Sequence, residues 1–164
     1  GVNTLVVQNT FDEFIGAHRR FEIKGKRGDV IVVDDYGHHP TEIHATLEGV
    51  KKFYQNERII VVFEPHQYSR TRLLLKEFAA SFSSADLVII PGIYAVRDTE
   101  ADKKGVTPED VVEKINAHGT QALYIEGYDA VVDFLKKEVH DRSVIITLGA
   151  GSVYKIGEKY LAQH

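Results

Sequence analysis

Five short apolar runs, each followed by a segment with helical spacing, constrain the fold of this chain more than any other feature. They lie at residues 30–33, 59–63, 87–90, 122–125 and 144–148. Uniformly apolar strands are typical of a parallel sheet with both faces covered, and strands that alternate with helices are typical of a doubly wound fold. Phe21 and Ile23 alternate with polar neighbours, which predicts a half-exposed strand paired in a hairpin with 30–34. We therefore expect an α/β domain with a doubly wound, mostly parallel, Rossmann-like sheet, one antiparallel edge strand and helices on both faces.

The helices are predicted from apolar positions at helical spacing and from capping signals. The helix starting at Pro108 has the clearest signals, because Thr107 can cap it and acids fill its first turn. Residues 99–106 are charged and are expected to form a loop. A capped helical turn is expected near 9–16, and the other helices are predicted at 41–54, 73–82, 107–117, 128–139 and 153–161.

Composition narrows the class of protein. The 164 residues suit one domain, 1–164, and the net charge of −4 gives no basic field for nucleic acid. The absence of cysteine excludes disulfides and thiolate metal sites. No apolar run is long enough for a membrane span, so a cytoplasmic location without a membrane partner is expected. The chain also lacks methionine, even at position 1, which suggests that it is a fragment of a larger protein.

Polar clusters follow four of the predicted strands, at 34–41, 64–72, 91–98 and 149–152. The carboxyl ends of parallel strands meet at one edge of a sheet, where ligands bind in open α/β folds. Arginine grips carboxylate or phosphate through paired donors, histidine adds a tunable donor, and aspartate accepts from hydroxyls or an amine. The pattern predicts a site for an anionic or zwitterionic ligand.

Structural explanations for the same residues stay open. The first cluster could be an ordinary strand-to-helix connection, with Pro40 in the first turn and Thr41 or His39 as the cap. In the same way, His66 could cap the helix that follows it, and Arg19-Arg20 could be a solvated pair on an edge strand.

Two further motifs have a functional and a structural interpretation. The turn at 149–152 resembles half of a dinucleotide fingerprint but lacks the full glycine spacing, so we interpret it as a tight turn for close packing. His38 and His39 lie beside two aspartates, yet zinc-site spacings are absent and no metal site is predicted. There is also no G-x-x-x-x-G-K-[ST] loop, so the chain could hold only part of a nucleotide.

Two blocks, DDYGHHPTEI at 34–43 and FEPHQYSRT at 63–71, resemble the C-terminal domain of the Mur ligases. His18–Phe21 and Gly149–Gly151 fall in the order that this family shows. The resemblance implies an ATP- and Mg²⁺-dependent carboxylate–amine ligase, which joins an amino acid to a UDP-muramoyl carboxylate through an acyl phosphate. It also implies three domains: an N-terminal one for the UDP-sugar, a central one with the phosphate loop and the metal ligands, and this one, which closes over both and is expected to be inactive alone.

Within the family, the blocks resemble most the members that join L-alanine to UDP-N-acetylmuramate in peptidoglycan biosynthesis. One alternative is the ligase that recycles murein tripeptide, which shares the DD-aromatic-x-HHP block but departs from HxYSRT. A second is a stand-alone module that binds a nucleotide or an amino acid without turnover. A complete small hydrolase is disfavoured, because the chain has neither a Gly-x-Ser-x-Gly elbow nor a cysteine.

The resemblance also implies roles for individual residues. Matched motif positions give ATP contacts at Arg20, towards the phosphates, and at Asp35, towards the ribose. They give amino-acid contacts at Tyr36, His38 and Arg70, with His66 in the same shell, and assign no catalytic residue with certainty. The chain departs from the family at Gln67, where a second arginine is common, and at Asp98 and Glu100, where the usual acidic pattern is missing.

Overall fold

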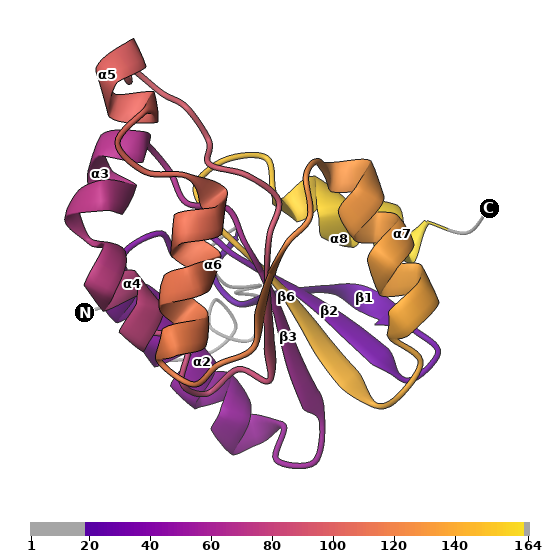
Figure 1. The fold of residues 1–164 in the computed structure, drawn as a ribbon. Helices are drawn as coiled ribbons and strands as arrows, with labels where there is room; N and C mark the ends of the chain where they lie inside the picture. Colours follow the sequence, from indigo (N-terminus) through magenta and orange to yellow (C-terminus); the bar gives the residue numbers. More distant parts are fainter. Residues whose placement is uncertain (1–18, 163–164) are drawn as a thin grey trace, which may run out of the picture.

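The computed structural model describes residues 19–162, so the helical turn predicted near 9–16 lies outside the described part. The described residues form a six-stranded sheet in the order β1-β2-β6-β3-β4-β5 (Figure 1). Among the six strands of the described residues, only the β1–β2 pair is antiparallel, and the other neighbours are parallel. The predicted fold class is therefore confirmed. The strands are β1 Glu22–Arg27, β2 Val30–Asp35, β3 Arg58–Phe63, β4 Leu87–Ile90, β5 Ala122–Tyr124 and β6 Ser143–Leu148.

Helices cover both faces of the sheet. One face packs against α2, α4 and α6, and the other against α7 and α8 (Figure 1). Alternate residues of the central strands belong to the two different cores, as shown by Val32 and Val33 of β2, because successive side chains of a strand point to opposite faces. The helices are α2 Pro40–Phe53, α3 Tyr68–Leu73, α4 Leu75–Ala80, α5 Glu100–Lys103, α6 Pro108–Ala117, α7 Tyr128–Glu138 and α8 Tyr154–Leu161.

The predicted helix at 73–82 is wrong in its start and its continuity. Helix α3 begins at Tyr68 and ends at Leu73, and α4 begins only after Leu74, which has φ −105° and ψ 19°. Five of the six residues of α3 are polar or tyrosine and only Thr71 is buried, so the helix has no apolar periodicity to reveal it. Leu73, taken as the first helical residue, is 79% exposed.

The loop predicted at 99–106 contains one turn of helix, α5. Thr99 caps it: the Thr99 hydroxyl accepts from Asp102 N at 3.2 Å, and Asp102 Oδ2 accepts from Thr99 N at 3.0 Å. None of its residues is buried, so again no apolar periodicity marked the element. The cap predicted at Thr107 is confirmed, and Asp110 completes a capping box with it.

The parallel register brings the polar clusters to one edge of the sheet. Asp35 at the end of β2 and Phe63 at the end of β3 both pair with Leu148 at the end of β6. An isolated bridge between His66 and Tyr94 continues the contact from the β3 loop to the β4 loop. The edge predicted from the sequence therefore exists. Within residues 19–162, no helix has the length and apolar character that crossing a bilayer requires.

Candidate functional site

The loop after β2 is folded around the Asp35 carboxylate. Asp35 is 5% exposed; its Oδ1 accepts from Gly37 N at 2.7 Å and its Oδ2 from Phe21 N at 2.8 Å. Tyr36 N donates to Arg19 O at 2.7 Å. The carboxylate thus ties the segment that enters the domain to the start of the β2–α2 loop. Among residues 19–162 each oxygen accepts one amide, and a carboxylate oxygen can accept a second donor.

The start of α2 fixes the positions of the paired histidines. His39 is the cap: its Nδ1 accepts from Thr41 N at 3.3 Å, and Pro40 follows at the first helical position. Glu42 Oε2 accepts from the amides of His38 and His39, at 3.1 Å each. Burial opposes its ionisation, but these two amides and nearby positive charge hold the pKa of Glu42 below its usual value. The capping interpretation is therefore correct for His39.

The residues assigned to the amino acid lie together. Arg70 Nη2 donates to His38 O at 3.0 Å, which joins α3 to the β2–α2 loop. The His38 ring is 5.3 Å from that of Tyr36 and 6.4 Å from that of His66, centroid to centroid. His66 stacks on Tyr94 at 5.4 Å. Three loops thus contribute to one group of aromatic, imidazole and guanidinium side chains.

His66 does not cap α3. The cap position is Gln67, whose side chain makes no capping hydrogen bond. Burial, the neighbouring His38 and the positive charge of Arg70 together lower the pKa of the His66 imidazole, while Asp98 opposes them. His66 is therefore neutral at neutral pH and presents one donor and one acceptor nitrogen.

Gln67 holds the second and third loops together. Its backbone has φ 76°, a conformation that few side chains favour. Gln67 N donates to Tyr94 O at 2.9 Å, and its Nε2 donates to Val96 O at 3.1 Å. Asp98 continues this contact by accepting from Ser69 N at 3.2 Å and from Ser69 Oγ at 3.1 Å. Gln67 and Asp98, two of the three positions expected to depart from the family pattern, therefore make structural bonds between loops.

The two adjacent arginines have different environments. The Arg20 side chain is 53% exposed and lies 3.5 Å from Glu42 Oε1, on the same carboxylate group that receives the His38 amide. The Arg19 side chain is 12% exposed and donates to Asp34 Oδ2 at 2.7 Å, to Gly149 O at 2.7 Å and to Gly151 O at 3.0 Å. The interpretation of both as a solvated pair is therefore wrong for Arg19, which lies in the floor of the site.

Glu64 is a further site residue, one that its sequence context did not single out. It is 6% exposed, and its Oε1 accepts from the Tyr128 hydroxyl at 2.7 Å. Its Oε2 is buried and has no hydrogen-bond partner among residues 19–162. Burial raises the pKa of the Glu64 carboxyl, although the Tyr128 hydrogen bond opposes the shift. The only available signal was a carboxylate directly after an apolar strand.

The glycine turn after β6 passes directly over Glu64. A Cβ on Gly149 would be 2.9 Å from Glu64 O, and one on Gly151 would be 2.7 Å from Glu64 Oε2. Gly149 also has φ 149°. The interpretation of this segment as a tight turn for close packing agrees with these distances.

The described residues offer no metal centre. Among residues 19–162, no group of three or more histidine, aspartate or glutamate side chains is arranged to hold a metal ion. These residues therefore do not fit a Mg²⁺ site.

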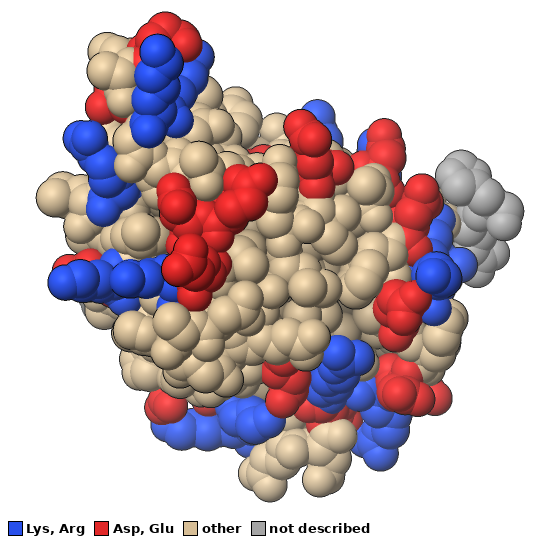
Figure 2. Space-filling view, viewed as in Figure 1, with Lys and Arg blue, Asp and Glu red and all other residues tan. Residues whose placement is uncertain are grey.

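On the face drawn in Figure 2, basic and acidic side chains occur in small interspersed groups.

Comparison with known proteins supports the resemblance. Residues 19–151 match the family described as Mur ligase, glutamate ligase domain. The UDP-N-acetylmuramate–L-alanine ligase of Caldanaerobacter subterraneus is 48% identical over 164 residues, which are 100% of this chain and 35% of that protein. The chain thus spans about a third of the length of this relative.

Two solved structures have the same fold. The UDP-N-acetylmuramate–alanine ligase of Thermotoga maritima superposes with a TM-score of 0.73 at 26% identity, covering 94% of this chain and 32% of that one. A domain assigned to a UDP-N-acetylmuramate:L-alanyl-γ-D-glutamyl-diaminopimelate ligase of Haemophilus ducreyi superposes with a TM-score of 0.65 at 27% identity, covering 87% of this chain and 97% of that one. By the match over residues 19–151, the chain belongs to the family of Mur ligase, glutamate ligase domains.

Proposed function

We propose that this chain is the C-terminal domain of a cytoplasmic, ATP-dependent ligase that joins L-alanine to UDP-N-acetylmuramate. The observation that carries the proposal is a meeting at the carboxyl edge of the sheet: Tyr36 and His38 come from the β2–α2 loop, His66 from the loop after β3 and Arg70 from α3. The 48% identity to a protein named for this reaction, over the whole chain, supports alanine as the amino acid.

The geometry supports a role for Arg70 in binding the carboxylate of the amino acid. One of its nitrogens is anchored on His38 O, which fixes the guanidinium while leaving other donors for a ligand. Because Gln67 bonds Val96 O instead of offering a second guanidinium, we expect Arg70 to be the main cationic contact. The neutral His66 imidazole can accept a proton from an ammonium group, which must lose one before the amine attacks.

We assign the ATP contacts to Arg20 and Asp35. Arg20 is exposed, and its ion pair with Glu42 is long, at 3.5 Å. Its guanidinium can therefore turn towards a phosphate. Asp35 retains lone pairs for a ribose hydroxyl. When bound, ATP activates the carboxylate for attack, and this chain positions reactants as the domain closes. The phosphate loop and the Mg²⁺ ligands belong to the domains that precede this one, so the chain alone should show no turnover.

A second candidate is the corresponding domain of a ligase that recycles murein tripeptide. The Haemophilus ducreyi domain favours it, because that domain is assigned to such an enzyme and superposes over 97% of its length. The HQYSRT segment at 66–71 and the identity of the first relative favour alanine.

The test uses the parent enzyme that contains this domain. Steady-state ADP release is measured with UDP-N-acetylmuramate and either L-alanine or the tripeptide. A charged hydrogen bond contributes about 1.5–3 kcal/mol, so Arg70→Ala should raise the KM for alanine by about 10- to 100-fold. Asp35→Ala should mainly raise the KM for ATP.

The matched control for Arg70 comes from the same helix. Arg72 is exposed and lies outside the group, so Arg72→Ala should keep the parent's constants. If Arg70→Ala behaves like Arg72→Ala, the site assignment is wrong. Preference for the tripeptide would replace alanine with the second candidate, and turnover by residues 1–164 alone would contradict the proposed division among domains.

A further inference from the structure

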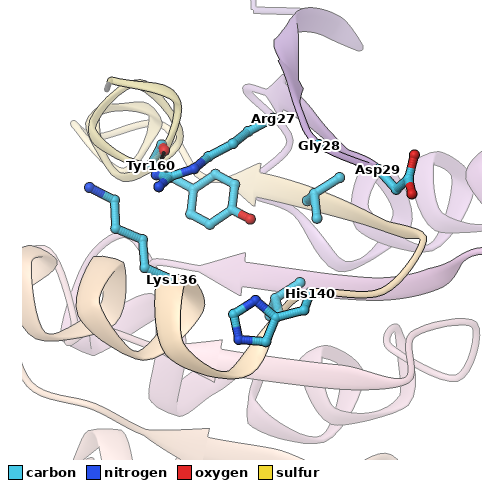
Figure 3. A pocket seen from close by; sticks show the side chains of 8 residues that line it. Arg27, Gly28, Asp29, Lys136, His140 and Tyr160 are labelled. Carbon is cyan, nitrogen blue, oxygen red and sulfur yellow. Dashed lines mark hydrogen bonds between the residues drawn. The ribbon is translucent and has the colours of Figure 1, made fainter. Parts of the chain in front are cut away.

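A cavity lies at the opposite end of the sheet from the candidate site. Its volume is about 340 Å³, and it is formed where the β1–β2 turn meets the ends of α7 and α8 (Figure 3). Val30, at the amino end of β2, lines it, whereas Asp35 at the other end of the same strand belongs to the candidate site. The residues that line the cavity include Arg27, Gly28, Asp29, Lys136, His140 and Tyr160 (Figure 3). This position excludes a direct role for the cavity in the ligation site.

Tyr160 and Arg27 form a preorganised wall of the cavity. Tyr160 is 2% exposed, yet no hydrogen bond involves its hydroxyl among residues 19–162, and Figure 3 shows this group directed along the cavity. Arg27 Nη1 donates to Tyr160 O at 2.8 Å, and its guanidinium carbon lies 5.4 Å from the centre of the Tyr160 ring. One nitrogen is therefore used as an anchor, while Nη2 and Nε remain as donors.

The cavity is lined by more basic side chains than acidic ones. Within the described part of the chain, neither Arg27 nor Lys136 has a carboxylate partner. The one acid in the lining, Asp29, is 71% exposed in its side chain and lies 3.8 Å from Lys26. Among residues 19–162, Arg27 and Lys136 therefore border this space without an ion pair, although Lys136 also borders a neighbouring pocket lined by Asp129 and Asp133.

The carboxyl ends of α7 and α8 carry partial negative charge near the cavity. The backbone carbonyls that lie nearest to it, however, already have hydrogen-bond partners. Tyr160 O accepts from Arg27, and Lys137 O lies 2.6 Å from His140 Nε2, which places the imidazole proton on that nitrogen. His140 Nδ1 is left without a partner in the described chain. The donors of Arg27, Lys136 and Tyr160 therefore outweigh the acceptors around the cavity.

We propose that this cavity binds a phosphate group, either as the inorganic ion or as the phosphate of a small metabolite. The fixed guanidinium supplies directed donors, the ammonium supplies a point charge, and the phenol supplies a third kind of donor. A phosphate dianion matches two unpaired cations, and 340 Å³ leaves room for a small attached group. Nothing in this site depends on the proposed ligase function.

The test is a titration of residues 1–164 with inorganic phosphate, at constant ionic strength maintained with chloride. Amide shifts are followed by nuclear magnetic resonance. We expect saturable shifts centred on Gly28 and Val139, with no comparable change at Tyr36. Lys136→Gln should weaken binding by about fivefold or more.

The neighbouring Lys137 provides the matched control, because it pairs with Glu138 and lies outside the cavity. Lys137→Gln removes the same charge and should change the affinity less than twofold. Tyr160→Phe tests the hydroxyl independently of net charge and should also weaken binding. Equal effects of Lys136→Gln and Lys137→Gln, or shifts that do not saturate, would mean general ionic effects and would overturn the proposal.

A second titration identifies the source of the phosphate. If glycerol 3-phosphate or a nucleoside 5′-monophosphate binds at Gly28 and Val139 more tightly than inorganic phosphate, the site takes a phosphorylated metabolite. If inorganic phosphate binds at least as tightly as both, the site takes the ion itself.

Discussion

Arg19→Ala is the substitution that most directly tests how the floor of the site is held together. Arg19 joins the segment entering the domain to the end of β2, through Asp34, and to the turn after β6, through Gly149 O and Gly151 O. Its guanidinium carbon also lies 5.1 Å from the ring centre of Tyr36. The neighbouring Arg20→Ala removes the same side chain from an exposed position and serves as the control.

The magnitude follows from burial. The Asp34 side chain is 1% exposed, and without Arg19 its remaining hydrogen-bond partner among residues 19–162 is the Thr147 hydroxyl at 2.6 Å. Removing one member of a buried ion pair destabilises a protein by about 3–5 kcal/mol, because the other charge stays buried. For a domain of this size, this corresponds to a fall in Tm of about 6–20 °C. Arg20→Ala should lower the free energy of unfolding by less than about 1 kcal/mol.

Urea unfolding of residues 1–164, followed by circular dichroism, measures both variants. The double variant Arg19→Ala with Asp34→Asn should be less destabilised than the sum of the two single variants, because each single variant leaves an unpaired partner. If the free energies of unfolding of Arg19→Ala and Arg20→Ala differ by less than about 1 kcal/mol, the buried ion pair does not hold the site floor.

Three further predictions concern single positions. Because burial raises the pKa of Glu64, its contribution to stability is present below the unfolded pKa of about 4.3 and is lost as pH rises through the folded pKa. Glu64→Gln should therefore gain stability relative to the parent as pH rises above that value; urea unfolding between pH 4 and 8 checks this, and a constant difference contradicts it. Gly149→Ala should destabilise by about 1–3 kcal/mol, since its Cβ would meet Glu64 O at 2.9 Å, whereas Gly49→Ala in α2 meets nothing within 4 Å and should stabilise by up to about 1 kcal/mol in thermal unfolding. Thr107→Ala should lower the stability by about 1 kcal/mol through loss of the cap on α6, and an unchanged urea midpoint would argue against it.

The layers and the strand order of the fold are predictable to different degrees. Buried strands were recognisable because both faces of each central strand are covered, which makes residues such as 59–63 uniformly apolar. The insertion of β6 between β2 and β3 was not predictable, because side-chain patterns do not encode which strands are neighbours. Helices α3 and α5 were missed because a helix that buries almost nothing has no apolar stripe.

The site was predictable where polar side chains directly follow a strand. Four polar clusters implied one edge, and the contacts of Arg70 with His38 and of His66 with Tyr94 agree with that placement. Partners far apart in the chain gave no local signal: Arg19 with Gly149 is separated by 130 residues, and Glu64 with Tyr128 by 64. Such contacts arise only after the sheet has brought the loops together.

Asp34 and Asp35 are adjacent in the sequence, but their side chains have different hydrogen-bond partners. Asp34 bonds to Thr147 and Arg19, whereas Asp35 bonds to the backbone amides of Phe21 and Gly37. Successive side chains of an extended strand point to opposite sides, so two identical neighbouring residues contact different groups. Asp34 therefore secures the sheet and Asp35 shapes the loop that would meet a ligand. It follows that substitutions at Asp34 should act first on stability and those at Asp35 first on binding, even though the two carboxylates are adjacent and both buried.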